Sequence, residues 1–252
     1  MDASQKCYVA YLDVMGFAQF VENNTADTAL KYLRDLTTVN SVFDAITPDV
    51  SSKFFSDTIA LFVLVEDDVK TDLARYMGFL RYVGMLQYQS ITAPNLMGLP
   101  LRGAITKGDF YSDDNGIIVG KAWVEAVKLE SKASVPRVIV KKEAHDYNIV
   151  LTMTVDKSAN YRAAPLRLDS DGELHCNYLN NVLDVDGYPA KNLTFILQHQ
   201  KAVVNNLKIT EGCRKTNDYY KWVMAYHNWF CTGYDELRQF IIPEDVCTME
   251  VV

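Results

Sequence analysis

The chain has 252 residues, of which 49% are hydrophobic and 23% are charged, and its formal net charge is −7. This composition is typical of a folded globular protein and excludes a disordered chain. The acidic balance argues against long nucleic acid as a partner, because a phosphate backbone requires a basic surface. No apolar run reaches the roughly 18 residues that a membrane span needs, and the opening MDASQK is unlike a secretory signal.

The cysteine pattern points to an intracellular protein without a disulfide framework. The five cysteines are odd in number, widely scattered and free of any CxxC pair, so a zinc site is also a poor interpretation. We expect buried thiols and a cytoplasmic location. The cysteines are Cys7, Cys176, Cys213, Cys231 and Cys247.

The predicted elements follow a regular order over the first 140 residues. This order is strand, helix, hairpin, helix, strand, helix and strand, the βαββαβ arrangement of ferredoxin-like folds, so we predict an α+β fold. In chain order the ranges are a strand at 7–13, a helix at 26–45, a hairpin at 53–64, a helix at 69–90, a strand at 101–110, a helix at 120–132 and a strand at 136–140.

After residue 150 the pattern weakens. Short strands and turns are predicted over 150–188, followed by helices at 190–208 and 216–231, the second rich in aromatic residues. We expect residues 7–148 to form the core and residues 149–252 to form a strand and helix elaboration packed on it.

Two aspartates stand where a metal site is expected in a βαββ unit. Asp13 ends the first strand, and Asp57 lies at the predicted tip of the hairpin. Neighbouring central strands bring such side chains together, and paired carboxylates suit Mg²⁺ or Mn²⁺. The turn at Gly16 offers backbone N–H groups to phosphate oxygens, so we count Phe17 as substrate-binding. Taken alone, an aspartate after a strand is more often a turn or cap residue.

Five short motifs strengthen the case for a nucleotide site. They are YLDVMGF at 11–17, KFFSDTIALF at 53–62, LRGAITKG at 101–108, IIVGKAWVEAVKLE at 117–130 and PRVIV at 136–140. In this order they resemble the motifs of class III adenylate and guanylate cyclases. The resemblance implies a metal-dependent enzyme that uses two divalent ions, Mn²⁺ or Mg²⁺, and a homodimer with two composite active sites.

The resemblance also implies roles for individual residues. Asp13 and Asp57 match the metal aspartates, and the Val14 carbonyl is an expected third ligand. Arg102 matches the arginine that holds triphosphate oxygens. Lys53 matches the lysine that reads the base edge, which in the family comes from the opposite protomer.

Three positions depart from the family pattern. Val124 replaces the transition-state asparagine, and Lys128 replaces the arginine four residues later, so we expect Lys128 to stabilise the transition-state charge. Ile117 replaces the aspartate that reads adenine in adenylate cyclases. The base pocket has therefore lost an acceptor.

These departures point to a subgroup. The opening YVAYLDVMGF, the KFFSD hairpin and the helix WVMAYHNW at 222–229 resemble the bacterial pyrimidine cyclases of the Pycsar antiphage system. That resemblance implies synthesis of cyclic UMP from UTP, or of cyclic CMP from CTP, and a separate effector protein that senses the product. Lys53 has only donors, which suits uracil O4 better than the cytosine amino group, so we place UTP ahead of CTP.

Two alternatives stay open at this point. A purine cyclase could keep Lys53 for its base. A degenerate cyclase-like module could bind a nucleotide without turning it over, and the missing asparagine and arginine favour it, whereas the intact Asp13 and Asp57 argue against it. We interpret the acidic run at 169–172 as a surface turn, and the aromatic residues of 219–229 as core or dimer contacts.

Overall fold

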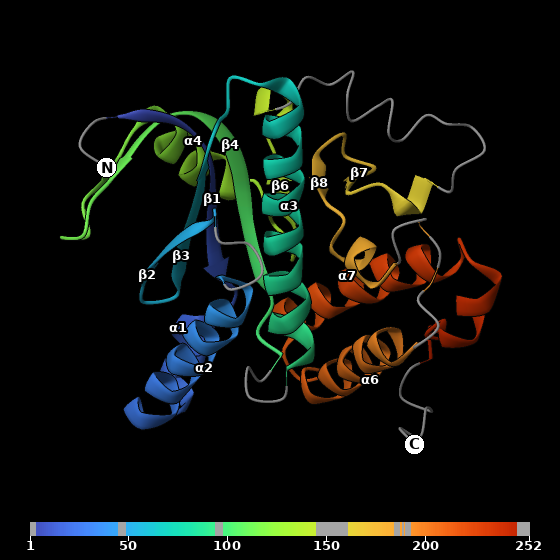
Figure 1. Ribbon diagram of the computed structural model, residues 1–252. Helices are drawn as coiled ribbons and strands as arrows, with labels where there is room; N and C mark the ends of the chain where they lie inside the picture. The colour runs from blue at the N-terminus through green and yellow to red at the C-terminus, as the bar shows by residue number, and fades with distance from the viewer. Residues whose placement is uncertain are drawn as a thin grey trace.

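The computed structural model describes residues 4–44, 49–93, 98–144, 161–183, 187, 189 and 193–245. Its centre is an eight-stranded sheet with the order β2-β3-β1-β4-β6-β8-β7, in which β5 pairs with β4 (Figure 1). The strands are β1 Gln5–Val14, β2 Ser51–Phe55, β3 Thr58–Leu64, β4 Leu101–Ser112, β5 Ile118–Val119, β6 Val138–Val140, β7 Leu166–Leu168 and β8 Leu174–Cys176.

Helices connect these strands and follow them. The α-helices are α1 Phe17–Asn23, α2 Ala26–Asp44, α3 Val69–Thr92, α4 Lys121–Glu130, α6 Thr194–Ile209 and α7 Arg214–Cys231. The short 3₁₀ helices are η2 Lys142–Ala144, η3 Tyr161–Ala163, η4 Tyr178–Val182 and η5 Asp235–Phe240. Within the described ranges no helix is long and apolar enough to cross a membrane.

The strand order confirms the predicted ferredoxin-like core. β2, β3, β1 and β4 are neighbours in that order, and each adjacent pair is antiparallel. Helices α1 and α2 connect β1 to β2, and α3 connects β3 to β4, which gives the βαββαβ order. β6 then adds to β4 in parallel.

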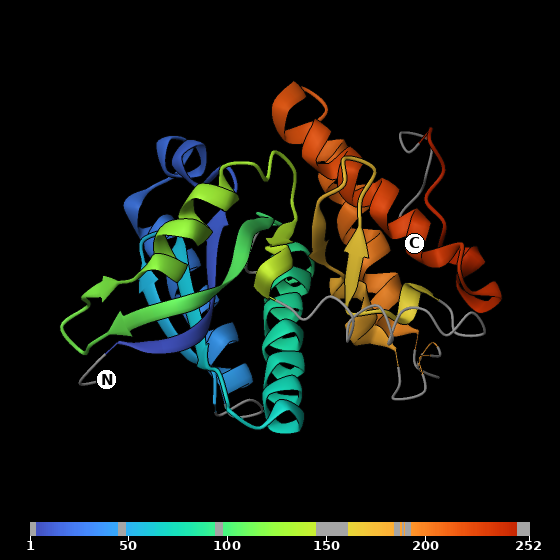
Figure 2. The same cartoon turned by 90° about the horizontal axis from the view of Figure 1, so that it is seen from above.

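The central strand β1 alternates between two buried faces. Ala10 and Leu12 belong to the larger apolar cluster with α2 and α3, whereas Cys7 and Val9 pack in a smaller cluster with Ala122 of α4. Successive side chains of a strand point to opposite faces, so α2 and α3 lie on one face and α4 on the other (Figure 2). Any residue on the odd positions of β1 therefore faces α4.

The C-terminal part both packs on the core and extends its sheet. α6 and α7 lie on the side of α3 away from β1 (Figure 1), where Tyr88 and Ile91 of α3 join their apolar cluster. β7 and β8 form a hairpin that continues the sheet beyond β6, with Ile139 opposite His175. The boundary predicted at residues 148 and 149 lies outside the described residues.

Local predictions hold at the hairpin and fail at one short helix. Phe55 pairs with Thr58, so the turn consists of Ser56 and Asp57, as predicted. The seven-residue α1 was not predicted, because only Gly16, with a left-handed φ of 81°, marks its start. Of the described cysteines, Cys213 is half-exposed rather than buried, and all four are free thiols.

Two histidines are buried as a hydrogen-bonded pair in the C-terminal core. The rings of His199 and His227 stack at 5.1 Å between centroids, with 3.0 Å between their Nδ1 atoms. His227 Nε2 lies 2.9 Å from the carbonyl of Phe240, and His199 Nε2 lies 3.0 Å from the hydroxyl of Tyr178. Each neighbour suits a neutral imidazole, and His227 is packed in the C-terminal core.

This burial predicts a loss of stability in mild acid. Burial lowers the pKa of His175 and of His227 to about 4, and it lowers the pKa of His199 well below its usual value. The unfolded chain then binds more protons than the folded chain between pH 6.5 and 4. Stability should fall as the pH falls through that window, by about 1.4 kcal/mol per pH unit for each histidine.

Urea unfolding at pH 7 and pH 5 measures this effect. We expect the unfolding free energy to drop by about 5 kcal/mol between the two values, because each of the three buried histidines contributes almost 2 kcal/mol. The variant His227→Gln is the control, since it should show about two thirds of that pH dependence whatever its stability at pH 7. Equal unfolding free energies for the natural chain at both pH values would contradict the prediction.

Candidate active site

The ends of β1 and β3 bring the two predicted metal aspartates together. In the strand register Asp13 lies opposite Thr58, and the backbone N–H of Val14 donates to the carbonyl of Asp57 at 3.1 Å. Asp13 occupies an odd position of β1 and therefore faces α4. Asp57 lies in the two-residue turn between β2 and β3, and the Asp57 side chain is half-buried.

Arg102 joins the same site from the other neighbour of β1. It lies opposite Asp13 in the β1–β4 register, and its Nε donates to Asp13 Oδ2 at 3.1 Å. The same Nε lies 2.6 Å from Glu130 Oε1 at the end of α4. The predicted phosphate-binding arginine is thus held between two carboxylates.

The electrostatics reflect this crowding of acidic groups. Burial raises the pKa of Asp13, the guanidinium of Arg102 opposes that rise, and the nearby charge of Asp57 adds to it. Burial likewise raises the pKa of Glu130, with Arg102 opposing and Asp13 adding. A cation beside these carboxylates would relieve their mutual repulsion.

Glu130 was not among the predicted site residues, although the sequence carries a signal for it. Ala122, Ala126 and Glu130 recur every four residues on α4, and all three are buried. A glutamate that continues the buried face of an amphipathic helix indicates a partner of opposite charge inside the protein. The partner's identity depended on the position of β4, which the spacing on α4 does not reveal.

Lys53 lines a cavity that neither Asp13 nor Asp57 lines. Its Nζ is 3.7 Å from Oδ1 of Asp114, in the turn between β4 and β5. The cavity of about 380 Å³ lies beside this pair, lined by the start of β2, Phe62 and residues 112–114. Ile117, the other predicted base-reading residue, is 54% exposed at the end of this turn. Asp114 is therefore a second polar residue beside Lys53, and it was not among the predicted site residues.

The last two predicted residues differ in their surroundings. Phe17 starts α1 and its ring packs against Phe20 and Tyr32 in the core, so a role in binding substrate would fall to its backbone N–H. Lys128 is exposed on α4, on the same side as Val124. Nothing in the described part of the chain pairs with its ammonium group.

The residues present fit a divalent cation with oxygen ligands. Asp13 and Asp57 supply two carboxylates at one end of the sheet, and the Val14 carbonyl is the predicted third ligand. Within the described ranges no group of three or more histidine, cysteine or acidic side chains is placed to hold a metal. A two-carboxylate site nevertheless suits Mg²⁺, which usually keeps several waters and takes further ligands from phosphates.

Two other sequence features have structural roles. Asp169 and Asp171 of the acidic run bind the buried guanidinium of Arg137, which confirms a turn rather than a calcium loop. Trp222 stacks on Tyr226 within α7, and these aromatic residues belong to or border the C-terminal core.

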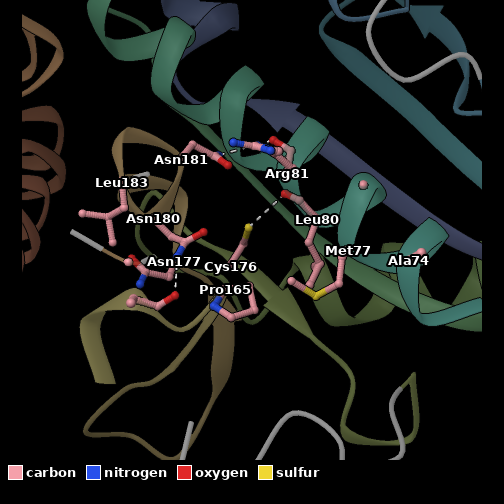
Figure 3. Close-up of a pocket in the computed structure, with 13 residues that line it drawn as sticks. Ala74, Met77, Leu80, Arg81, Pro165, Cys176, Asn177, Asn180, Asn181 and Leu183 are labelled. Carbon is pink, nitrogen blue, oxygen red and sulfur yellow. Dashed lines mark hydrogen bonds between the residues drawn. The ribbon is translucent and has the colours of Figure 1, made fainter. Parts of the chain in front are cut away.

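A separate cavity lies between α3 and the segment that follows β7 and β8 (Figure 3). It measures about 560 Å³, and Met77 and Arg81 of α3 form part of its wall. Asn177, at its edge, donates to the carbonyls of Arg162 and Ala164, and so fixes the neighbouring loop. None of the predicted site residues lines this cavity.

Comparisons with known proteins give neither a family model nor a curated protein that matches the chain. The chain is similar in fold to solved cyclase domains. The guanylyl cyclase domain of the RhoGC fusion protein from the aquatic fungus Blastocladiella emersonii is 12% identical over 69% of this chain and 97% of that chain, with a TM-score of 0.49. The adenylyl cyclase CyaB from P. aeruginosa is 18% identical over 59% of this chain and 82% of that chain, with a TM-score of 0.40.

Proposed function

We propose that this protein is a metal-dependent nucleotide cyclase of the class III type, which converts a nucleoside triphosphate to a 3′,5′-cyclic monophosphate and pyrophosphate. The observation that carries the proposal is the convergence of Asp13, Asp57 and Arg102 at the ends of three adjacent strands. Two carboxylates and one guanidinium at a single sheet end suit a metal-bound triphosphate.

In this reaction the ribose 3′-oxygen attacks the α-phosphorus, and the bond to the β-phosphate oxygen breaks. The 3′-hydroxyl loses its proton and pyrophosphate leaves in line. Divalent cations lower the pKa of the hydroxyl and neutralise the leaving group. Asp13 and Asp57 hold these ions, Arg102 binds triphosphate oxygens, and Lys128 stabilises the charge of the transition state.

Exposed apolar side chains support a homodimer as the active form. Phe55 lies at the end of β2, Ile117 lies just before β5, and Val124 and Val127 precede Lys128 on α4. All four apolar side chains are exposed. We propose that a second copy covers these surfaces. One protomer then supplies the aspartates, and its partner supplies the base-reading and α4 residues.

For the substrate we propose a pyrimidine triphosphate, with UTP first. Ile117 cannot accept a hydrogen bond from an adenine amino group, and an unpaired buried donor costs about 1–3 kcal/mol. Lys53 can donate to uracil O4. CTP is the second candidate because Asp114, beside Lys53, could accept from the cytosine amino group. The same acceptor would suit the adenine amino group, so a purine cyclase is the alternative that the substrate assay has to exclude.

Incubation with each of the four triphosphates and Mn²⁺, followed by mass spectrometry, tests the proposal. We expect cyclic UMP as the main product and roughly 5- to 150-fold slower turnover of ATP. Faster turnover of ATP or GTP than of both pyrimidines would reject the pyrimidine assignment. Nucleotide binding without any product would support the degenerate module instead.

The variant Asp114→Ala, which removes the acceptor, separates the two pyrimidines in the same assay. If Asp114 reads the cytosine amino group, this change should lower CTP turnover and leave UTP turnover near its starting value. Exclusive turnover of CTP by the natural chain would reject the donor argument for Lys53 and leave the cyclase assignment in place.

The resemblance to Pycsar cyclases supports a role in antiphage defence, in a cytoplasmic setting. There the cyclic pyrimidine nucleotide would act as a second messenger for a separate effector protein. Accumulation of the product in infected but not in uninfected cells would support this role.

A further inference from the structure

One N–H group of Arg102 lies between two carboxylates. Nε carries a single hydrogen, and it is donated to Asp13 Oδ2 at 3.1 Å. Glu130 Oε1 lies closer, at 2.6 Å, yet it is shielded from solvent and has no hydrogen-bond partner in the described part of the chain. Glu130 is therefore ion-paired with Arg102, but its Oε1 accepts no hydrogen bond because the single Nε hydrogen is donated to Asp13.

The fold holds the carboxylate of Glu130 in place. Glu130 is 7% exposed and continues the buried face of α4 formed by Ala122 and Ala126. Leaving a buried carboxylate oxygen without a hydrogen bond disfavours the folded state. A second state in which Arg102 donates to Glu130 would satisfy that oxygen.

We propose that Glu130 is a positioning residue that receives the guanidinium of Arg102 when a divalent cation binds Asp13. The inference rests on the proposed function, because it takes Asp13 as a metal ligand. In the state described here Arg102 already occupies one oxygen of Asp13, so an entering cation competes with it for the same carboxylate. Arg102 then needs only a small movement to donate to Glu130, and no buried charge loses its partner.

This exchange makes metal affinity depend on residues that do not ligate the metal. Without Glu130 the cation must displace Arg102 from Asp13 with no second carboxylate to accept it. Without Arg102 the competitor is gone. The two residues should therefore change metal affinity in opposite directions.

Titration of the full chain with Mn²⁺ in the absence of nucleotide, monitored by electron paramagnetic resonance, gives the affinity for Mn²⁺ without turnover. We expect Arg102→Gln to bind Mn²⁺ about tenfold more tightly and Glu130→Gln about tenfold more weakly than the natural chain. The matched control is Glu130→Asp, which keeps the charge but withdraws the carboxylate from Nε. It should also weaken Mn²⁺ binding several-fold, whereas a purely through-space effect of charge would leave it near the natural value.

The outcomes separate this inference from the proposed function. Mn²⁺ binding that Asp57→Asn does not reduce would reject the metal site, and with it both proposals. Binding that depends on Asp57 but is the same in Glu130→Asp and the natural chain would overturn only the exchange. If the Glu130 variants do not fold by circular dichroism, Arg102→Gln decides, because unchanged or weaker Mn²⁺ binding there contradicts competition.

Discussion

Replacing Asp57 with alanine should abolish cyclisation while the protein stays folded. The side chain is half-buried at a two-residue turn and makes no ion pair or side-chain hydrogen bond with the described part of the chain. Its backbone carbonyl, which accepts from Val14, is kept in the variant. Loss of one metal ligand removes several kcal/mol of transition-state stabilisation, so we expect kcat to fall by about 10³-fold or more.

Product formation with saturating UTP and Mn²⁺ measures this change, and circular dichroism checks the fold. The control variant is Asp67→Ala, because Asp67 is an exposed aspartate just beyond the end of β3 that is opposite to Asp57. It should retain full activity. A folded Asp57→Ala protein that turns over at the natural rate would eliminate the two-aspartate assignment.

Mixing two inactive variants should restore activity, if each site is built from two chains. An Asp57→Ala chain keeps its base-reading half, and a chain with Lys53→Ala and Lys128→Ala keeps its metal half. Their heterodimer contains one complete site and one doubly damaged site. With random pairing of equal amounts we expect about a quarter of the activity of the natural protein, because half of the dimers are mixed and each has one working site.

The matched control for this experiment is a mixture of Asp57→Ala and Asp13→Ala chains. Both lack the metal half, so none of their dimers has a complete site and activity should stay at background. A confirmed heterodimer of the first mixture without activity would show that each site is built within one chain.

Much of the core was predictable because its signals are local. The polar pair Ser56 and Asp57 between two apolar runs predicted a hairpin, and the pairing of Phe55 with Thr58 confirms it. Helical periodicity likewise predicted α3 and α7 within a few residues of their observed ends. The short helix α1 escaped prediction because seven residues give too little periodicity.

The contacts around the candidate site were less predictable because they join distant positions. Arg102 meets Asp13 across 89 positions, and no spacing rule shows that Glu130 approaches both. Asp114 could not be placed beside Lys53 without knowing how the turn between β4 and β5 folds over β2. The joining of β7 and β8 to the sheet escaped prediction for another reason, because strands of three residues give almost no alternation of polar and apolar residues.

The central position of β1 has a consequence for how the protein is made. Asp13 is the partner of Thr58 on one side and of Arg102 on the other, and Arg102 in turn contacts Glu130. During synthesis β1 emerges first. One of its edges stays unpaired until β4 has been made, and one of its faces stays uncovered until α4 has been made. Pairing between such distant segments is slow and leaves apolar surface open to aggregation. A nascent chain that ends before Glu130 would be a client for chaperones.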